Sequence, residues 1–177
     1  STSHDNKWSL WAVGERLDFI YDGATWQVER DGRIAHSCGL NRNTTQSSVG
    51  PSATKILLNN ALTNTAGMGD PTTNNRVDIK RDGKYAIHCG GAIPTLNSGE
   101  RGDFLVYRNG TGGDLILFAR GHSSITSGTI GVGQGKEREL VAGDYVELYQ
   151  GTSSASSTST ITSNEASMPT LCVQEIL

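Results

Sequence analysis

The stretch RVDIKRDGKYAIHC, residues 76–89, is typical of two short strands joined by a tight turn. Asp82 and Gly83 stand at its centre, and glycine allows the positive φ that such turns require. After the turn, Tyr85, Ile87 and Cys89 occupy alternate positions and share one face of the second strand. The stretch therefore predicts a strand, a turn and another strand, and Gly143 and Asp144 are expected to form the same kind of turn before the later run YVELY.

Similar short apolar runs continue to the end of the chain, each bounded by Gly, Asn, Asp or Pro. All four prolines are expected between strands, where a missing N–H costs no ladder hydrogen bond. One run, ATKILLNNAL, also fits helical spacing, and its two adjacent asparagines favour a strand. The pattern predicts an all-β sandwich or barrel. The expected strands cover residues 54–59, 75–80, 84–89, 103–109, 114–119, 136–141, 144–150 and 170–176.

The N-terminal part predicts a separate small hairpin. Asp22 and Gly23 supply a turn signal, and the residues on both sides of them alternate between apolar and polar. Residues 34–51 are rich in Ser, Thr, Asn and Gly and are interpreted as a linker or an ordered crossing between modules. We therefore divide the chain into a hairpin module with its linker, residues 1–45, and a larger domain, residues 46–177.

Composition limits the classes of function. The chain has 177 residues, 22 glycines and a net charge of -3, and its 15 basic residues are scattered, so no nucleic-acid partner is expected. No apolar run is long enough to span a membrane, and the start STSHDNK is not typical of a secretory signal. Free buried thiols are favoured over one disulfide for Cys38, Cys89 and Cys172.

Two strands, containing FLVY at 104–107 and LILF at 115–118, are apolar on both faces. A sandwich strand with one face in water should alternate, so something must cover the second face. A second copy of the chain in a symmetric oligomer is the favoured cover, and a loop lying over the sheet is the alternative.

The order of these segments resembles the C1q and tumour-necrosis-factor (TNF) superfamily, from about Gln46 to Leu177. The motif DG.Y.I and the later motif L..GD.VEL stand in the same order as in that superfamily. The resemblance implies a jelly roll and a homotrimer whose inner sheets pack around a threefold axis. The residues that carry it are Asp82, Gly83, Tyr85, Ile87, Leu140, Gly143, Asp144, Val146, Glu147 and Leu148.

The segment GERLDFIYDGATWQVERDGR, residues 14–33, is similar to a pattern that recurs in bacteriophage tail and fibre proteins. Together the two resemblances imply a phage virion protein, located on a tail fibre or on the capsid surface.

No motif predicts catalysis, a cofactor or a metal. The run SGTIGVGQGKERE, residues 127–139, lacks a Walker loop because Ile130 and Glu137 replace the required residues, so a flexible loop is expected there. The four histidines are far apart, although an ion on a trimer axis would need one ligand per chain. The tripeptide RGD at 101–103 matches an integrin-binding motif, but Asp103 also begins an expected strand.

Three hypotheses follow for the function. The first is a trimer at a fibre or spike tip that binds a host glycan or protein through polar loops containing Asn64, Asp70, Asn74, Ser123, Thr126, Gln134, Ser156 and Thr160. The second is a capsid decoration or head-fibre protein that docks on other virion proteins through Trp8, Trp11 and Trp26. The third is a polysaccharide depolymerase that uses a pair of the acids Asp70, Asp78, Asp103, Asp114 and Glu137.

Overall fold

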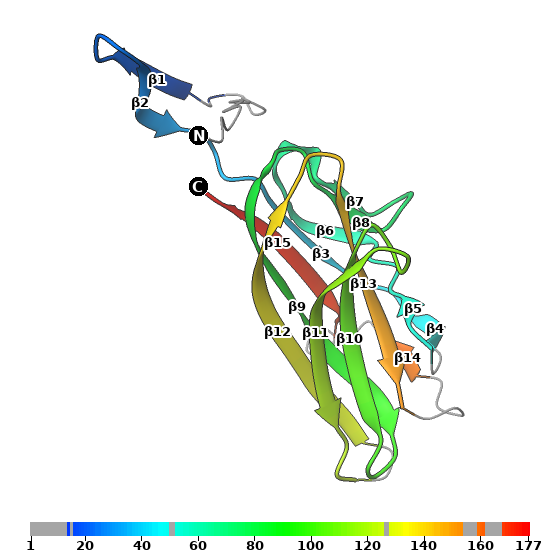
Figure 1. Ribbon diagram of the computed structural model, residues 1–177. Helices are drawn as coiled ribbons and strands as arrows, with labels where there is room; N and C mark the ends of the chain where they lie inside the picture. Colours follow the sequence, from blue (N-terminus) through cyan, green and yellow to red (C-terminus); the bar gives the residue numbers. More distant parts are fainter. Residues whose placement is uncertain (1–13, 15, 50–51, 126–127, 154–158, 162–167) are drawn as a thin grey trace.

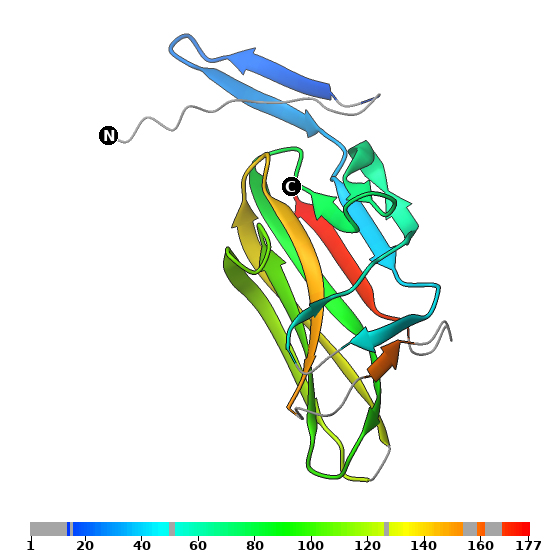
Figure 2. The same cartoon turned by 90° about the vertical axis from the view of Figure 1, so that its right-hand side faces the viewer.

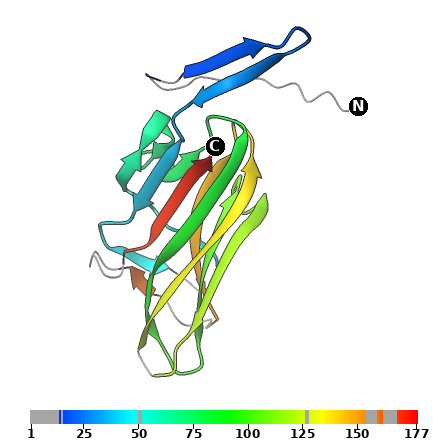
Figure 3. The same cartoon turned by 90° about the vertical axis from the view of Figure 1, so that its left-hand side faces the viewer.

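A hairpin and a two-sheet sandwich make up the computed structural model (Figure 1), which describes residues 14, 16–49, 52–125, 128–153, 159–161 and 168–177. The hairpin strands are β1 (Arg16–Tyr21) and β2 (Trp26–Gly32). Gly23 has a φ of 95°, as the predicted turn requires. Figures 2 and 3 show the hairpin beyond one end of the sandwich, the end at which the C-terminal strand finishes.

Sheet I is antiparallel and joins segments from both ends of the jelly roll. Its central strand is the last one of the chain, which pairs on one side with residues 84–90 and on the other with residues 37–41. The strand order is β12 (Gly128–Leu140), β9 (Gly83–Leu96), β15 (Thr170–Ile176), β3 (Ser37–Asn41) and β6 (Asn60–Asn64).

Sheet II packs against sheet I and is also antiparallel. Its order is β11 (Asp114–His122), β10 (Arg101–Arg108), β13 (Tyr145–Thr152), β8 (Arg76–Asp78) and β7 (Gly69–Asp70), and β5 (Thr54–Lys55) pairs with the far end of β13. A short 3₁₀ helix, η1 (Thr65–Gly67), precedes β7, and β4 (Gln46–Val49) pairs with β14 (Ser159–Ile161). None of the described helices is long and apolar enough to cross a membrane.

The core lies between the two sheets and follows the predicted alternation. Tyr85 and Ile87 of β9 are completely buried, as are Val146 and Leu148 of β13. Cys89 continues the buried face of β9, and burial raises the pKa of its thiol to about 11. All three cysteines are free, as predicted, but only Cys38 and Cys89 are buried, and Cys172 is partly exposed.

Residues 34–51, interpreted as a linker or an ordered crossing, contain a strand of sheet I, because residues 37–41 form β3 and pair with β15. Two other expectations about individual segments are wrong. The glycine-rich run is no loop, because Val132 is buried and the run pairs with β9 along its length. Pro94 lies within β9, beside the register shift near Gly128, where a strand tolerates the missing N–H.

Two local details also differ from the sequence interpretation. Gly83 begins β9 without a positive φ, whereas Gly143 has the expected turn conformation with a φ of 96°. The ambiguous run ATKILLNNAL is not helical, and it is not one strand either. It contains β5 of sheet II and the start of β6 of sheet I, because the chain crosses between the sheets at residues 56–59.

A buried ion pair joins the root of the hairpin to the sandwich. Arg81 donates from Nε to Glu175 Oε1 at 2.8 Å and from Nη2 to Oε2 at 2.5 Å, and both side chains are at least 96 % buried, with exposures of 4 % and 3 %. Glu175 also accepts the backbone N–H of His36 at 3.0 Å, and Arg81 donates to the carbonyl of Ile34 at 3.1 Å. Tyr85 donates its hydroxyl to the Arg81 carbonyl at 2.8 Å.

Replacing one member of this pair should be strongly destabilising. We expect Arg81→Met to lower the free energy of unfolding by about 3–5 kcal/mol, because it leaves the Glu175 carboxylate buried without its cation. The double variant Arg81→Met/Glu175→Met should recover much of this loss. Urea denaturation measures both. Lys84→Met, which removes an exposed ion pair with Glu137, is the control and should leave the midpoint unchanged. Equal midpoints for Arg81→Met and Lys84→Met would contradict the role of the pair.

Candidate binding surface

The outward face of sheet II gathers three tyrosines. Tyr145 and Tyr149 alternate with the buried residues of β13, and Tyr107 of β10 pairs with Glu147 between them. The rings of Tyr107 and Tyr149 meet edge to face with centroids 5.3 Å apart. We call the surface formed by Lys55, Arg76, Tyr107, Tyr145, Glu147 and Tyr149 the tyrosine face.

Glu147 cross-links this surface. Its residue exposure is only 6 %, it accepts the hydroxyl of Tyr149 at 2.8 Å, and it forms an ion pair with Lys55. Lys55 also donates to the carbonyl of Asn74 at 2.7 Å, which ties the loop after β7 to the sheet. Burial, the hydrogen bond to Glu147 and the charge of that carboxylate raise the pKa of Tyr149. The charged groups therefore hold the aromatic rings in place.

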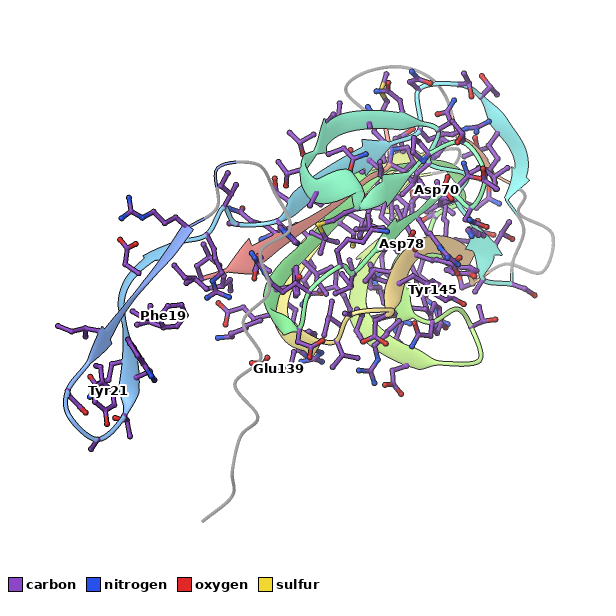
Figure 4. The ribbon with its side chains drawn as sticks, turned by 90° about the horizontal axis from the view of Figure 1, so that it is seen from above. Phe19, Tyr21, Asp70, Asp78, Glu139 and Tyr145 are labelled. Carbon is purple, nitrogen blue, oxygen red and sulfur yellow. The ribbon has the colours of Figure 1, made fainter. Side chains whose placement is uncertain are left out.

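At one end of the tyrosine face, Arg76 covers Tyr145, with the guanidinium carbon 4.1 Å from the ring centroid. Arg76 also donates to Asp78 at 2.8 Å, and Asp78 lies opposite Tyr145 in the ladder (Figure 4). A surface hollow of about 330 Å³ adjoins this pair, and its lining continues into the turn before β13. Aromatic planes beside fixed donors and acceptors can stack on a ligand and hydrogen-bond to it. The hollow is lined by Arg76, Asp78, Ile79, Lys80, Ala142, Gly143 and Asp144.

The predicted loop residues Asn64, Asp70 and Asn74 lie together near the tyrosine face, and their side chains shape their own loop. Asn64 Oδ1 accepts the N–H of Gly69 at 2.7 Å, and Asp70 accepts the Thr73 N–H at 2.9 Å and the Asn74 side-chain amide at 2.6 Å. The backbone bond from Thr73 is the main reason that the pKa of Asp70 is lowered. These side chains hold the loop in shape and leave Thr72 and Thr73 exposed on it.

The other predicted loop residues do not join this cluster. Ser123 lies at the opposite end of the sandwich, is 3 % exposed and donates to the Ile125 carbonyl at 2.7 Å. Gln134 lies in β12 and lines the edge between β11 and β12. Thr126 and Ser156 lie outside the described residues, and Thr160 falls in β14 with its side chain outside them.

The acids considered for a depolymerase lie apart from one another, and three of them pair with basic side chains. Asp103 is 6 % exposed and accepts from Arg120 at 2.8 Å, so the RGD tripeptide does not present its carboxylate to solvent. Asp114 pairs with Arg108, and Glu137 pairs with Lys84. Among the described residues, no group of three or more His, Cys, Asp or Glu side chains could hold a metal ion.

The doubly apolar strands are β10 and β11 of sheet II. The chain itself covers part of their outward face, because Arg120 lies 4.5 Å from the centroid of Phe118 and Tyr149 packs on Tyr107. Cover by a second copy remains a prediction. Tyr107 is the residue that the sequence interpretation missed, although the shared face of Tyr145, Glu147 and Tyr149 follows from their alternation.

The outward face of sheet I differs, because it contains a patch of small residues beside the exposed ion pair of Lys84 and Glu137. Alternation and register place Gly133 and Gly135 of β12 beside Gly90 and His88 of β9. A Cβ at Gly135 would come within 2.2 Å of His88 Nδ1, so a larger residue there would displace the imidazole. We call Gly39, Ala86, His88, Gly90, Gly131, Gly133 and Gly135 the small-residue face.

Of the predicted docking tryptophans, Trp26 is described, and Trp8 and Trp11 lie outside the described residues. Trp26 lies in β2 and is 70 % exposed, and its ring centroid is 5.2 Å from that of Tyr21.

No family model matches the sequence, and no curated protein is similar to it. Solved structures are similar in fold. The globular domain of zebrafish complement 1qA matches with a TM-score of 0.58 at 15 % identity, covering 80 % of this chain and 97 % of that one. Murine APRIL at pH 8.0 matches with a TM-score of 0.59 at 12 % identity, covering 81 % and 100 %. Eiger TNF from S. frugiperda matches with a TM-score of 0.55 at 12 % identity, covering 81 % and 92 %.

These likenesses and the two-sheet topology define the chain as a C1q/TNF-like jelly roll with an added N-terminal hairpin. The fold predicted from the sequence is confirmed.

The raised pKa of Tyr149 predicts a loss of stability in alkali. Its neutral form is favoured in the folded state, so its contribution is complete below the ordinary tyrosine pKa of about 10 and is lost as the pH rises above it. We expect the free energy of unfolding to fall as the pH rises above about 10, and to fall less in Tyr149→Phe. Urea denaturation at each pH measures this. Parallel curves for the two proteins would contradict the coupling of Tyr149 to Glu147.

Proposed function

We propose that this chain is a non-enzymatic attachment protein of a phage virion, in which a homotrimer binds a host-surface glycan or protein at a fibre or spike tip. The tyrosine face carries the proposal. It combines partly exposed tyrosines with a charged network and an adjacent loop, all fixed on strands of a rigid sandwich. The similarity of the hairpin sequence to phage tail and fibre proteins supports the virion location.

The small-residue face supports the trimer. Glycine and alanine leave the backbone of sheet I accessible, so another copy of the chain can approach it closely. Proteins with the C1q/TNF fold usually form trimers. A head-to-tail contact between two different parts of this face, repeated in each copy, closes into a ring and agrees with threefold symmetry.

Capsid decoration is the second candidate function. The 70 % exposure of Trp26 favours it, because a large exposed aromatic side chain is a typical anchor for a protein partner. In that case the hairpin would dock on the shell, and the jelly roll would point outward.

A long side chain on the small-residue face should abolish the trimer. Nothing lies within 4 Å of a Cβ at Gly131, so Gly131→Gln should fold as a monomer and fail to associate. Gly112, in the turn between β10 and β11, has equally open surroundings and provides the matched control, Gly112→Gln. Analytical ultracentrifugation measures the mass of each. A Gly131→Gln trimer as stable as that of Gly112→Gln would place the self-association surface elsewhere.

Removal of one aromatic ring from the tyrosine face should weaken attachment. We expect Tyr145→Ala to bind host cells at least about tenfold more weakly, as is typical of a tyrosine hot spot. Ile125→Ala removes an apolar side chain, 64 % exposed, from the opposite end of the sandwich and should bind normally. Flow cytometry with labelled protein measures both, and circular dichroism checks that both variants fold.

The same labelled protein, added to virions that lack it, separates the two candidate functions. Label confined to the tail supports attachment. Label spread over the shell, with binding lost in Trp8→Ala/Trp11→Ala, supports decoration and contradicts the first proposal.

A further inference from the structure

The hairpin has one apolar face that nothing in the described chain covers. Cross-strand pairs place Tyr21 opposite Trp26 and Phe19 opposite Val28 on the same face. Phe19 is 45 % exposed, Tyr21 is 52 % exposed and Trp26 is 70 % exposed. An isolated two-stranded ribbon is only marginally stable in water, so a ribbon with this composition needs a partner surface.

The shape of the hairpin is nevertheless well defined by its own polar groups. Asp22 accepts the backbone N–H groups of Ala24 at 2.9 Å and Thr25 at 2.7 Å and the side-chain amide of Gln27 at 2.5 Å. Arg16 donates to Asp18 at 2.6 Å. These bonds fix the turn and the strand next to it, so the hairpin offers a prearranged aromatic surface.

The root of the hairpin has a fixed position on the sandwich. The buried Arg81–Glu175 pair holds residues 34–36 through the Ile34 carbonyl and the His36 N–H. The hairpin therefore starts at the end of sheet I at which β15 finishes (Figure 3). Three exposed apolar residues also lie near this junction. They are Ile34, Ile176 and Leu177, which are 42 %, 40 % and 56 % exposed.

We propose that the apolar face of the hairpin is covered by the hairpins of two further copies of this chain, which form a second trimer interface beyond the sandwich. The inference rests on the proposed trimer. When sheet I is buried around a threefold axis, three hairpin roots emerge at the same end, and the high local concentration favours their association. Phe19, Tyr21, Trp26 and Val28 then face one another.

The opposite face of the hairpin suits solvent in this arrangement. Ile20 pairs with Gln27 there. A bundle of three such ribbons buries its aromatic side chains and leaves the face with Ile20 and Gln27 in water. In a fibre, this bundle would continue the trimer away from the jelly rolls. We therefore infer that this face binds the hairpins of other copies of the chain. Binding of a different virion protein to the same face would contradict the inference.

Trp26 reports directly on this interface. In a Trp8→Phe/Trp11→Phe background it is the sole tryptophan, because the chain has three. We expect its emission in the intact trimer to be shifted to the blue and protected from acrylamide, and to move to the red when the trimer dissociates. Ultracentrifugation of the same sample reports the trimer separately. If the trimer is intact but Trp26 is exposed to solvent, the hairpin interface is wrong and the proposed trimer stands. If no trimer forms, both the hairpin interface and the proposed trimer are wrong.

Phe19 and Ile20 offer a matched pair of variants. They are neighbours with similar exposure, 45 % and 50 %, but they lie on opposite faces. Phe19→Glu should raise the trimer dissociation constant at least tenfold and expose Trp26, whereas Ile20→Glu should change neither. Equal effects of the two variants overturn the inference. So does a Phe19→Glu protein that stays trimeric with Trp26 protected but no longer binds virions, since the face then serves another partner.

Discussion

The buried ion pair of Arg81 and Glu175 ties the root of the N-terminal hairpin to the sandwich. Glu175 stands near the end of the chain, Arg81 precedes the longest strand of sheet I, and the two together hold the residues that connect the hairpin to the sandwich. A charge pair in the interior is costly to desolvate, so it persists only with near-complete hydrogen bonding. Here the backbone of residues 34–36 completes that bonding, and the ion pair therefore sets the direction in which the hairpin leaves.

The two outward faces of the sandwich have different chemistry, and the difference organises the proposed function. Around His88 and Gly90, sheet I presents glycine, alanine and one histidine, which suits close packing of identical subunits, and the exposed Lys84–Glu137 ion pair lies beside this region. Sheet II presents tyrosines locked by Glu147, Lys55 and Arg76, which suits recognition of a foreign ligand. In the proposed trimer, self-association uses the first face and leaves the second available.

The partner of the hairpin distinguishes a fibre-tip protein from a capsid decoration protein. If the aromatic face of the hairpin is used between subunits, the tyrosine face is the main aromatic surface left for a receptor, in agreement with a fibre tip. If the hairpin instead docks on a capsid, its exposed Trp26 serves a different partner, and the trimer depends on sheet I alone. The structure gives little support to a depolymerase, because the candidate acids Asp103, Asp114 and Glu137 each pair with a separate basic side chain.

The sequence by itself determined the class of fold, the faces of β9 and β13 and the turns at Gly23 and Gly143, because alternation and turn chemistry depend on neighbouring residues. It did not predict β3, since five residues in a polar stretch become a strand only when β15 supplies a partner. It also missed the glycine-rich half of β12, which resembles a loop until β9 pairs with it. Only the tertiary structure decided which outward side chains meet, as with Tyr107 and Tyr149. Such side-chain contacts depend on the register between strands that are far apart in the sequence, and a local sequence pattern does not predict that register.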